Sequence, residues 1–205
     1  MTRHVYIVDD DDAVRASLQS LLSTQPNMLS GGFRSGDAFV AEMAALEPGV
    51  ALLDIHMPGA SGLEILRLMR DAGAPHVPII ITGQGNIALA VQAMKGGALD
   101  FLEKPYDHLG LLEIVERAFV QLEEASGQAA RQQLARERIN TLSAREHDVL
   151  MGLIAGRANK VIAFELDISP RTVEIYRANL MAKLEVRNLS EALRVAFAAG
   201  LLADH

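Results

Sequence analysis

The 205-residue sequence predicts an α/β domain with a doubly wound, five-stranded parallel sheet, followed by a small all-α domain of four helices with a helix-turn-helix. The first observation is an alternation of short apolar runs with amphipathic helical segments over residues 1–122. The second is that only helical patterns occur from residue 141 onward. The third is that polar residues follow four of the five apolar runs, at the edge where such sheets bind ligands.

The five apolar runs and the segments between them define the first domain, residues 1–122. Strands are predicted at 4–8, 28–34, 50–54, 78–82 and 98–103, and helices at 13–23, 36–46, 62–71, 86–95 and 107–122. The run at 50–53 is wholly apolar and leads into Asp54, with a Pro58-Gly59 breaker after it, which is typical of a strand buried on both faces. The Gly31-Gly32 pair weakens the strand at 28–34.

The second domain, residues 141–205, follows a helical linker at 123–140 that we expect to break at Gly127. Helices are predicted from the Ser143 capping box to 155, from 159 to 166, from Pro170 onward and from 190 to 199. The segment 167–169 is a tight turn. In the third helix Val173, Tyr176, Leu180 and Leu184 form the predicted buried stripe, and Arg171, Glu174, Ile175, Ala178 and Asn179 are predicted to face outward.

Composition narrows the possible functions. The sequence has no cysteine, which excludes disulfides and thiolate chemistry. Its apolar runs are all shorter than the roughly 18 residues of a membrane span, so we expect a cytoplasmic protein without a membrane segment. Residues 1–122 hold 15 acidic against 8 basic residues, which argues against nucleic-acid binding there, whereas residues 123–205 hold 11 of each.

Polar residues at four strand ends indicate one site. Asp9 and Asp10 follow the first strand, Asp54 ends the third, Thr82 the fourth and Lys104 the fifth. Taken singly, each has a simpler explanation, such as a solvated acid, a strand-end cap or a solvated lysine. The acidic run 9–12 also suits the first turn of a helix. Because the carboxyl ends of parallel strands lie along one edge of a sheet, the occurrence of polar residues at four of these ends favours a ligand site.

Carboxylates grouped in this way favour a hard cation with oxygen ligands, for which Mg²⁺ is the best candidate. We expect Asp10 and Asp54 as direct ligands, Asp9 bound directly or through water, and the backbone carbonyl of His56 as a further ligand. Because the metal would neutralise the charge of an incoming phosphoryl group, the Asp54 carboxylate could attack the phosphorus in line. In that site the Thr82 hydroxyl and the Lys104 ammonium would contact phosphoryl oxygens.

Residues 4–120 resemble the receiver domain of two-component response regulators. The resemblance rests on the Asp9-Asp10 pair, Asp54 in Leu-Leu-Asp-Ile-His-Met-Pro-Gly, Thr82 in Ile-Ile-Thr-Gly, and Lys104-Pro105. It implies a flavodoxin-like fold, Asp54 as acceptor of a phosphoryl group from a histidine kinase, and a cis Lys104–Pro105 bond. It also implies that Phe101, three residues before the lysine, turns inward on activation.

Residues 141–199 are similar to the LuxR/FixJ-type DNA-binding domain, whereas helical periodicity alone would equally allow a generic four-helix unit. The matching residues include Leu142–Glu146, Gly156, Asn159-Lys160, Ile168-Ser169, Arg171–Glu174 and Met181–Leu184; Tyr176 replaces a frequent His. The resemblance implies that the third helix of this domain enters a DNA major groove. The expected DNA contacts are Lys160, Arg171, Thr172, Glu174, Arg177 and Lys183, with Lys160 and Lys183 on phosphates.

The sequence is therefore interpreted as a phosphorylation-controlled transcription factor and not as an enzyme. Its expected partners are a sensor histidine kinase, promoter DNA, RNA polymerase and, when phosphorylated, a second copy bound through a surface with Val91 and Lys95. One alternative is a Mg²⁺-dependent phosphatase with Asp54 as nucleophile, but His56 stands where such enzymes have a second acid. Another is an adaptor that never contacts DNA. The kinase, the operator and the sign of regulation stay open.

Overall fold

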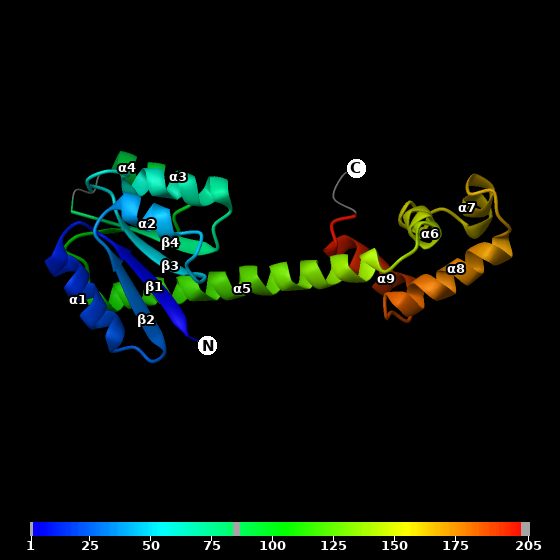
Figure 1. Ribbon diagram of the computed structural model, residues 1–205, viewed down its shortest axis with the longest axis horizontal. Coiled ribbons are helices and arrows are strands. Elements are labelled where there is room, and N and C mark those ends of the chain that lie inside the picture. The colour runs from blue at the N-terminus through cyan, green and yellow to red at the C-terminus, as the bar shows by residue number, and fades with distance from the viewer. Residues whose placement is uncertain (1, 84–86, 202–205) are drawn as a thin grey trace. The chain divides into compact units, whose positions relative to one another are not determined.

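Five parallel strands form one sheet in the N-terminal part of the computed structural model, which describes residues 2–83 and 87–201 (Figure 1). The strands are β1 Arg3–Val8, β2 Met28–Phe33, β3 Gly49–Asp54, β4 His76–Thr82 and β5 Asp100–Glu103, in the order β2-β1-β3-β4-β5. In the register Val8 pairs with Leu53, and Asp54 pairs with Ile81. The strand ends that carry the predicted polar residues therefore lie along one edge, as the sequence predicts.

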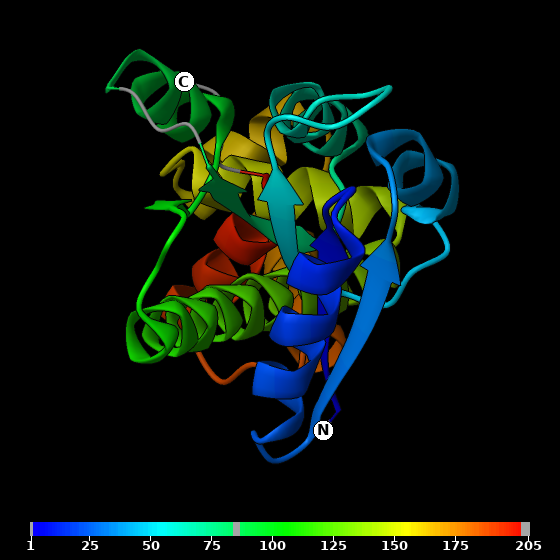
Figure 2. The same ribbon diagram turned by 90° about the vertical axis from the view of Figure 1, so that its left-hand side faces the viewer.

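Helices cover both faces of this sheet (Figure 2). The N-terminal helices are α1 Asp12–Ser23, α2 Gly36–Glu42, α3 Gly62–Ala72, α4 Ile87–Gly96 and the start of α5 His108–Asn140. One core joins α1 and α5 to the sheet through side chains such as Leu18 and Leu111, and the other joins α2, α3 and α4 through Phe39, Ile65 and Ala93. The predicted doubly wound α/β fold is confirmed.

Several boundaries differ from the prediction, among them the start of β5, at Asp100 and not at 98, and two of the differences have local backbone reasons. Helix α2 ends at Glu42, not at residue 46, because the chain tightens into a turn in which the Ala45 N–H donates to the Glu42 oxygen at 2.8 Å. Strand β4 starts at His76, two residues before Pro78. The Pro78 oxygen accepts from the Leu99 N–H at 2.8 Å, and β5 begins only at the next residue. The nitrogen of Pro78, which has no hydrogen to donate, therefore lies on the β5 side before the pairing of β4 with β5 begins.

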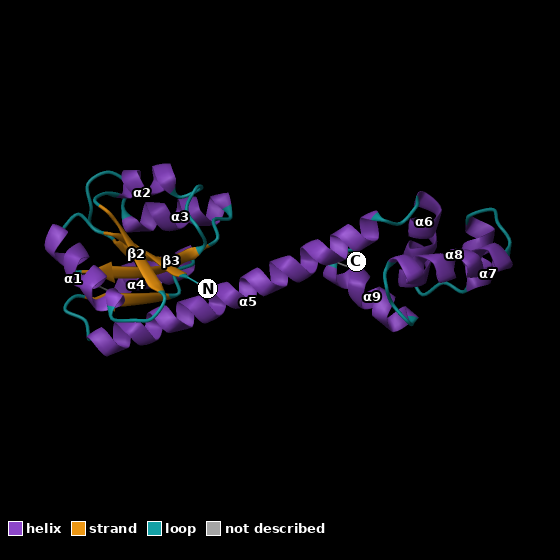
Figure 3. Cartoon of the chain, turned by 60° about the horizontal axis from the view of Figure 1, so that its bottom comes forward, coloured by secondary structure: helices purple, strands orange, loops and turns teal. Residues whose placement is uncertain are grey.

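The C-terminal part, residues 126–205, forms a second unit with its own core. It contains the end of α5 together with α6 Ala144–Ile154, α7 Asn159–Glu165, α8 Pro170–Lys183 and α9 Leu189–Ala198 (Figure 3). The expected break at Gly127 is wrong, because α5 continues through it to Asn140. The Gly127 oxygen accepts from the Arg131 guanidinium at 3.1 Å, and Ala135 and Ile139 are buried in the second core.

Helix α8 shows the predicted two-sided pattern. Val173, Leu180 and Leu184 are fully buried and Tyr176 packs against the same core. The five residues predicted to face outward, Arg171, Glu174, Ile175, Ala178 and Asn179, are all exposed. The N-terminus is formed as predicted, with the Ser169 hydroxyl accepting from the Thr172 N–H at 3.1 Å and Pro170 as the first helical residue.

Candidate functional site

A cavity of about 340 Å³ opens at the carboxyl edge of the sheet, where the predicted residues meet. It is lined by Asp9, Asp10, Asp11, Val14, Asp54, His56, Gly83 and Lys104. These residues come from the last position of β3 and from the segments that follow β1, β3, β4 and β5. Four separate parts of the sequence are therefore brought together because parallel strands end at the same edge.

Three carboxylates in this cavity form a candidate cation site. One carboxylate oxygen each of Asp9, Asp10 and Asp54 lies within 4.8 Å of the others. Asp9 and Asp54 are buried, whereas Asp10 is exposed. Among the described residues, none donates a hydrogen bond to the buried Oδ1 of Asp54. A buried carboxylate oxygen without a donor, beside two further acids, fits a hard cation with oxygen ligands.

Lys104 supplies the positive charge of the cavity. Its Nζ donates to Asp9 Oδ2 at 2.6 Å and lies 3.5 Å from Asp54 Oδ2. Burial disfavours the ammonium, but the two carboxylates outweigh that effect and raise the pKa of Lys104. The lysine is therefore held in its charged form, and the Lys104–Pro105 bond that follows is cis.

Burial raises the pKa of the Asp54 carboxyl above its ordinary value. The Lys104 ammonium opposes this shift, the charge of Asp9 adds to it, and the His56 backbone N–H opposes it. The ionised form of Asp54 is thus less favourable than that of a free aspartate, and further positive charge in the cavity would favour it. This electrostatic deficit matches the cation site formed by the same acids.

Two contacts that sequence reasoning did not identify hold Asp9 in place. The Asp11 N–H donates to Asp9 Oδ1 at 2.9 Å, and the buried Arg15 guanidinium donates to the Asp9 backbone oxygen at 2.5 Å. Asp11 is also the N-cap of α1 and accepts from Ala13 N–H at 2.7 Å. An acid directly before a helical pattern was the available signal for the cap, but the sequence offers none for the Arg15 contact.

The remaining predicted residues of this unit occupy different surroundings. Thr82 is fully buried at the end of β4. His56 is exposed and lines the cavity, while Phe101 is partly buried against the core beneath α4. The predicted turn at 84–85 lies outside the described residues, as does the predicted helix start at Asn86. On α4, Val91 and Lys95 are exposed, and neither reaches the cavity lining.

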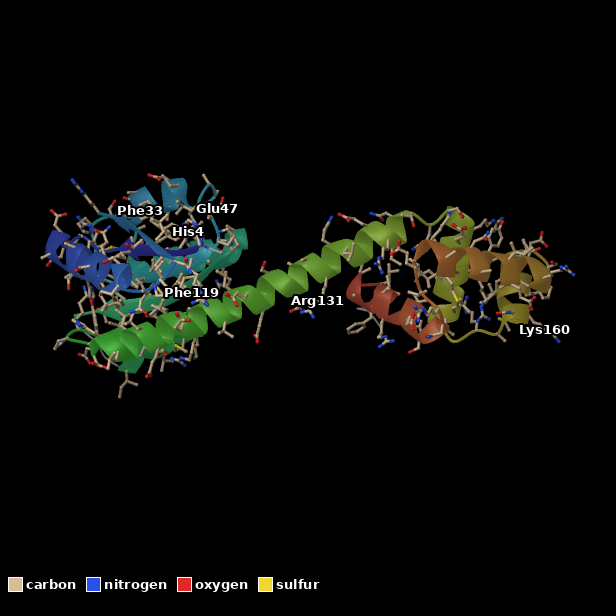
Figure 4. All side chains as sticks on the ribbon, turned by 90° about the horizontal axis from the view of Figure 1, so that it is seen from below. His4, Phe33, Glu47, Phe119, Arg131 and Lys160 are labelled. Atoms are coloured by element: carbon tan, nitrogen blue, oxygen red, sulfur yellow. The ribbon has the colours of Figure 1, made fainter. Side chains whose placement is uncertain are left out.

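The C-terminal unit contains a helix-turn-helix formed by α7 and α8. Asp167 in the connecting turn has φ 54°, the left-handed conformation that Asp tolerates better than most residues. The exposed face of α8 presents Arg171 and Glu174, and Lys160 is exposed on α7 without an ion-pair partner in the described chain (Figure 4). These three predicted side chains are therefore accessible to a large ligand.

Two other residues predicted to contact DNA already have protein partners. The Thr172 hydroxyl shares a 2.8 Å hydrogen bond with the Ser169 hydroxyl. The Arg177 guanidinium donates to Asn159 Oδ1 at 2.8 Å, which links α8 to the start of α7. Each of these side chains keeps further hydrogen-bonding atoms for a ligand.

Lys183 is the most strongly engaged residue of the predicted set. Its Nζ donates to Glu146 Oε2 at 2.6 Å. The same oxygen accepts from the Ser143 N–H at 2.7 Å and from the Ser143 hydroxyl at 2.9 Å, which completes the capping box of α6. The Lys183 hydrogen bond and the cap both lower the pKa of Glu146. The lowered pKa favours the ionised carboxylate, and its Oε2 accepts three hydrogen bonds.

Comparison with known proteins matches two parts of the chain to known families. Residues 5–116 match the response regulator receiver domain, and residues 140–196 match the bacterial regulatory proteins of the luxR family. The transcriptional regulatory protein FixJ of Bradyrhizobium diazoefficiens is 44% identical over 98% of both chains. The response regulator protein TodT of Pseudomonas putida is 36% identical over 93% of this chain and 84% of its own.

Solved structures agree with these relatives. Full-length FixJ from B. japonicum has a TM-score of 0.60 at 44% identity and covers 98% of this chain and 100% of its own. The response regulator StyR has a TM-score of 0.82 at 32% identity and covers 96% and 99%. In the described part of this chain, no helix is long and apolar enough to cross a membrane.

Proposed function

The chain belongs to the two-component response regulators in which a receiver domain precedes a LuxR-type DNA-binding domain, and we propose that Asp54 is its phosphoacceptor. The family consists of DNA-binding transcriptional regulators, which sets aside the phosphatase and adaptor alternatives. The observation that carries the proposal is the buried, unpartnered Oδ1 of Asp54 in an acidic cavity that Lys104 also lines. The proposed phosphoryl donor is a sensor histidine kinase.

Receiver domains generally bind Mg²⁺ in such an acidic pocket, and the donor set of this one fits that ion. We propose that Asp10 and Asp54 are direct ligands, that Asp9 binds directly or through water, and that the His56 carbonyl is a backbone ligand. The bound ion would supply charge neutralisation for the phosphoryl group. The raised pKa of Asp54 supports this assignment, because the Lys104 ammonium does not fully offset the effects of burial and of the Asp9 charge.

In the proposed transfer, the Asp54 carboxylate oxygen forms a bond to phosphorus while the P–N bond of the kinase phosphohistidine breaks. Lys104 lies 3.5 Å from Asp54 and would form an ion pair with the new phosphoryl oxygens. Thr82 would donate its hydroxyl to one of them. The space that its movement leaves behind β4 would be filled by Phe101, which is only partly buried in the described structure.

The proposed DNA-binding surface is the exposed face of α8. Arg171, Glu174 and Thr172 lie at its N-terminal half, where the recognition helix of a helix-turn-helix contacts base edges. Lys160 would contact a phosphate, and Arg177 would contribute the guanidinium nitrogens that Asn159 leaves free. Lys183 is already paired with Glu146.

We further propose that phosphorylation favours a two-fold dimer through α4 and β5. Val91 and Lys95 are exposed on α4 and Glu103 is exposed on β5, so opposite charges are available across a two-fold axis, whereas Asp100 of β5 already pairs with Arg117. A dimer would place two α8 helices on half-sites about one helical turn of DNA apart. The regulator would then act in the cytoplasm, where promoter DNA and RNA polymerase are its partners.

The experiment for the phosphoacceptor is incorporation of label from radioactive acetyl phosphate with Mg²⁺. The unaltered chain should acquire an acid-labile phosphoryl group, and Asp54→Asn should lose it while keeping the fold, because the substitution is nearly isosteric. Asp71→Asn is the matched control, since Asp71 is an exposed acid on α3 away from the cavity. Label that persists at full level in Asp54→Asn would contradict the proposal.

A further inference from the structure

Polar contacts tie α8 to its neighbours on both sides of its buried stripe. Arg177 and Lys183 each lie three residues from the fully buried Leu180, one before it and one after it. At about 100° per residue, the two side chains leave the helix about 60° to either side of Leu180. Arg177 donates to Asn159 on α7, and Lys183 donates to Glu146 on α6.

The buried stripe decides which side of α8 faces the core, but the hydrophobic effect is non-directional and leaves the finer rotation about the helix axis to other contacts. Charge-assisted hydrogen bonds are shorter and stronger than neutral ones, so each one holds a point on α8 at a short distance from a fixed partner. The Lys183–Glu146 contact is the shorter of the two at 2.6 Å, and its acceptor is only 4% exposed. Because Glu146 is also held by the Ser143 cap, it is a rigid anchor for the end of α8.

We infer that Lys183 and Glu146 form a positioning pair that sets the rotation of α8, and thereby determines which side chains meet the base edges. The inference rests on the proposed role of α8 as the recognition helix. It assigns Lys183 a different role from the phosphate contact expected from sequence. Glu146, a buried residue of α6 that does not contact DNA, would then also determine which DNA sequence is bound.

The two roles of Lys183 predict different measurements. A lysine that contacts a phosphate contributes about one unit to the slope of log affinity against log salt, and its loss weakens all duplexes alike. A positioning lysine leaves that slope unchanged. Its loss weakens the specific duplex more than a random one, because misdirected side chains lose base contacts and keep phosphate contacts.

The experiment uses the full-length chain and a duplex that the unaltered protein selects from a random-sequence pool, with a shuffled duplex as reference. Lys183→Met should lower the affinity ratio of selected to shuffled duplex by roughly tenfold, within the range for groups in direct contact, and leave the salt slope unchanged. Glu146→Gln should have a similar effect, because glutamine keeps the capping box but not the charge. The double variant should lose no more than either single one, and Lys183→Arg should restore the ratio.

Lys160→Met is the matched control, since Lys160 is exposed and without an ion-pair partner among the described residues. It should lower the salt slope by about one and weaken both duplexes equally. The same result for Lys183→Met would overturn the inference in favour of a phosphate contact. A loss of thermal stability with an unchanged affinity ratio would overturn it in favour of a purely structural role. If the unaltered chain selects no duplex, the proposed function itself fails, and this inference with it.

Discussion

The two units each contain a lysine that donates to a carboxylate at 2.6 Å, but the surroundings of the two pairs differ. In the N-terminal unit Lys104 and Asp9 line an open cavity, where the neighbouring Asp54 has a buried oxygen without a donor. In the C-terminal unit Glu146 is buried and accepts from Lys183 and twice from Ser143. The first site is incomplete, whereas in the second site one carboxylate oxygen already accepts three hydrogen bonds.

This difference shows why the contact alone does not determine the role of an ion pair. An incomplete polar site can gain interactions, so a new charge such as a phosphoryl group can alter its partners. An acceptor that already has three donors has little to gain from a ligand, so its contacts fix geometry. We therefore expect the Lys104 pair to respond to ligands and the Lys183 pair to be insensitive to them.

The largest expected effect is on the rate of phosphoryl transfer, when Lys104 is replaced and Lys183 serves as the comparison. Lys104→Met should slow phosphoryl incorporation from acetyl phosphate by about 100-fold, the size typical of a lost electrostatic contact to a reacting oxygen. Lys183→Met should leave incorporation unchanged, because its partner lies in the other unit. Rates are measured with radiolabelled donor at saturating Mg²⁺. Equal rates for the Lys104 variant and the unaltered chain would remove the distinction between the two pairs.

Mg²⁺ should stabilise only the unit with the incomplete site. At a concentration 100 times the dissociation constant, binding adds about 2.7 kcal/mol to the free energy of unfolding of the N-terminal unit. Asp10→Asn should remove most of that gain, since Asp10 has no other partner in the described structure, and Lys183→Met should not change it. Calorimetric scans with and without Mg²⁺ give the values. A gain retained in Asp10→Asn would contradict the ligand role of Asp10.

In the absence of Mg²⁺, Asp54 and Glu146 should change the unfolding free energy of their units with pH in opposite directions. The folded pKa of Asp54 lies above its ordinary value of 3.8, so the unfolding free energy falls as pH rises from 3.8 through the folded pKa. The folded pKa of Glu146 lies below its ordinary value of 4.5, so its contribution is present above 4.5 and is lost as pH falls through the folded pKa.

The substitution Asp54→Asn tests the predicted pH dependence of Asp54, and its effect on stability is the smallest of those expected. It should raise the unfolding free energy of the N-terminal unit at pH 7 by about 1 kcal/mol, the usual size for a single substitution. The gain should shrink as pH falls toward 4, because the unaltered carboxyl then becomes neutral. Urea unfolding at the two pH values measures both quantities. A destabilised variant at pH 7 would reverse the assigned sign.

Strand ends and helix faces could be predicted from the sequence because both follow from local patterns. The apolar run before Asp54 placed it at the sheet edge, and parallel topology then brought Asp9, Thr82 and Lys104 to the same edge. The stripe of α8 followed from the spacing of its apolar residues.

Contacts between distant segments could not be predicted in this way. The Arg15 contact to the Asp9 backbone and the Lys183 contact to Glu146 join separate elements, and periodicity carries no information on such pairs. The continuity of α5 through Gly127 was missed because a single glycine lowers helix propensity by only about 1 kcal/mol. Favourable residues on both sides of Gly127 outweigh that cost.

The central claim is that the incomplete carboxylate of Asp54 accepts the phosphoryl group, and chemical trapping tests it most directly. The unaltered chain is treated with acetyl phosphate and Mg²⁺, reduced with borohydride, digested and analysed by mass spectrometry. Because reduction converts an aspartyl phosphate to homoserine, we predict homoserine at position 54, and its absence when Mg²⁺ is left out. Homoserine at position 9 or 10 with aspartate intact at 54 would contradict the account.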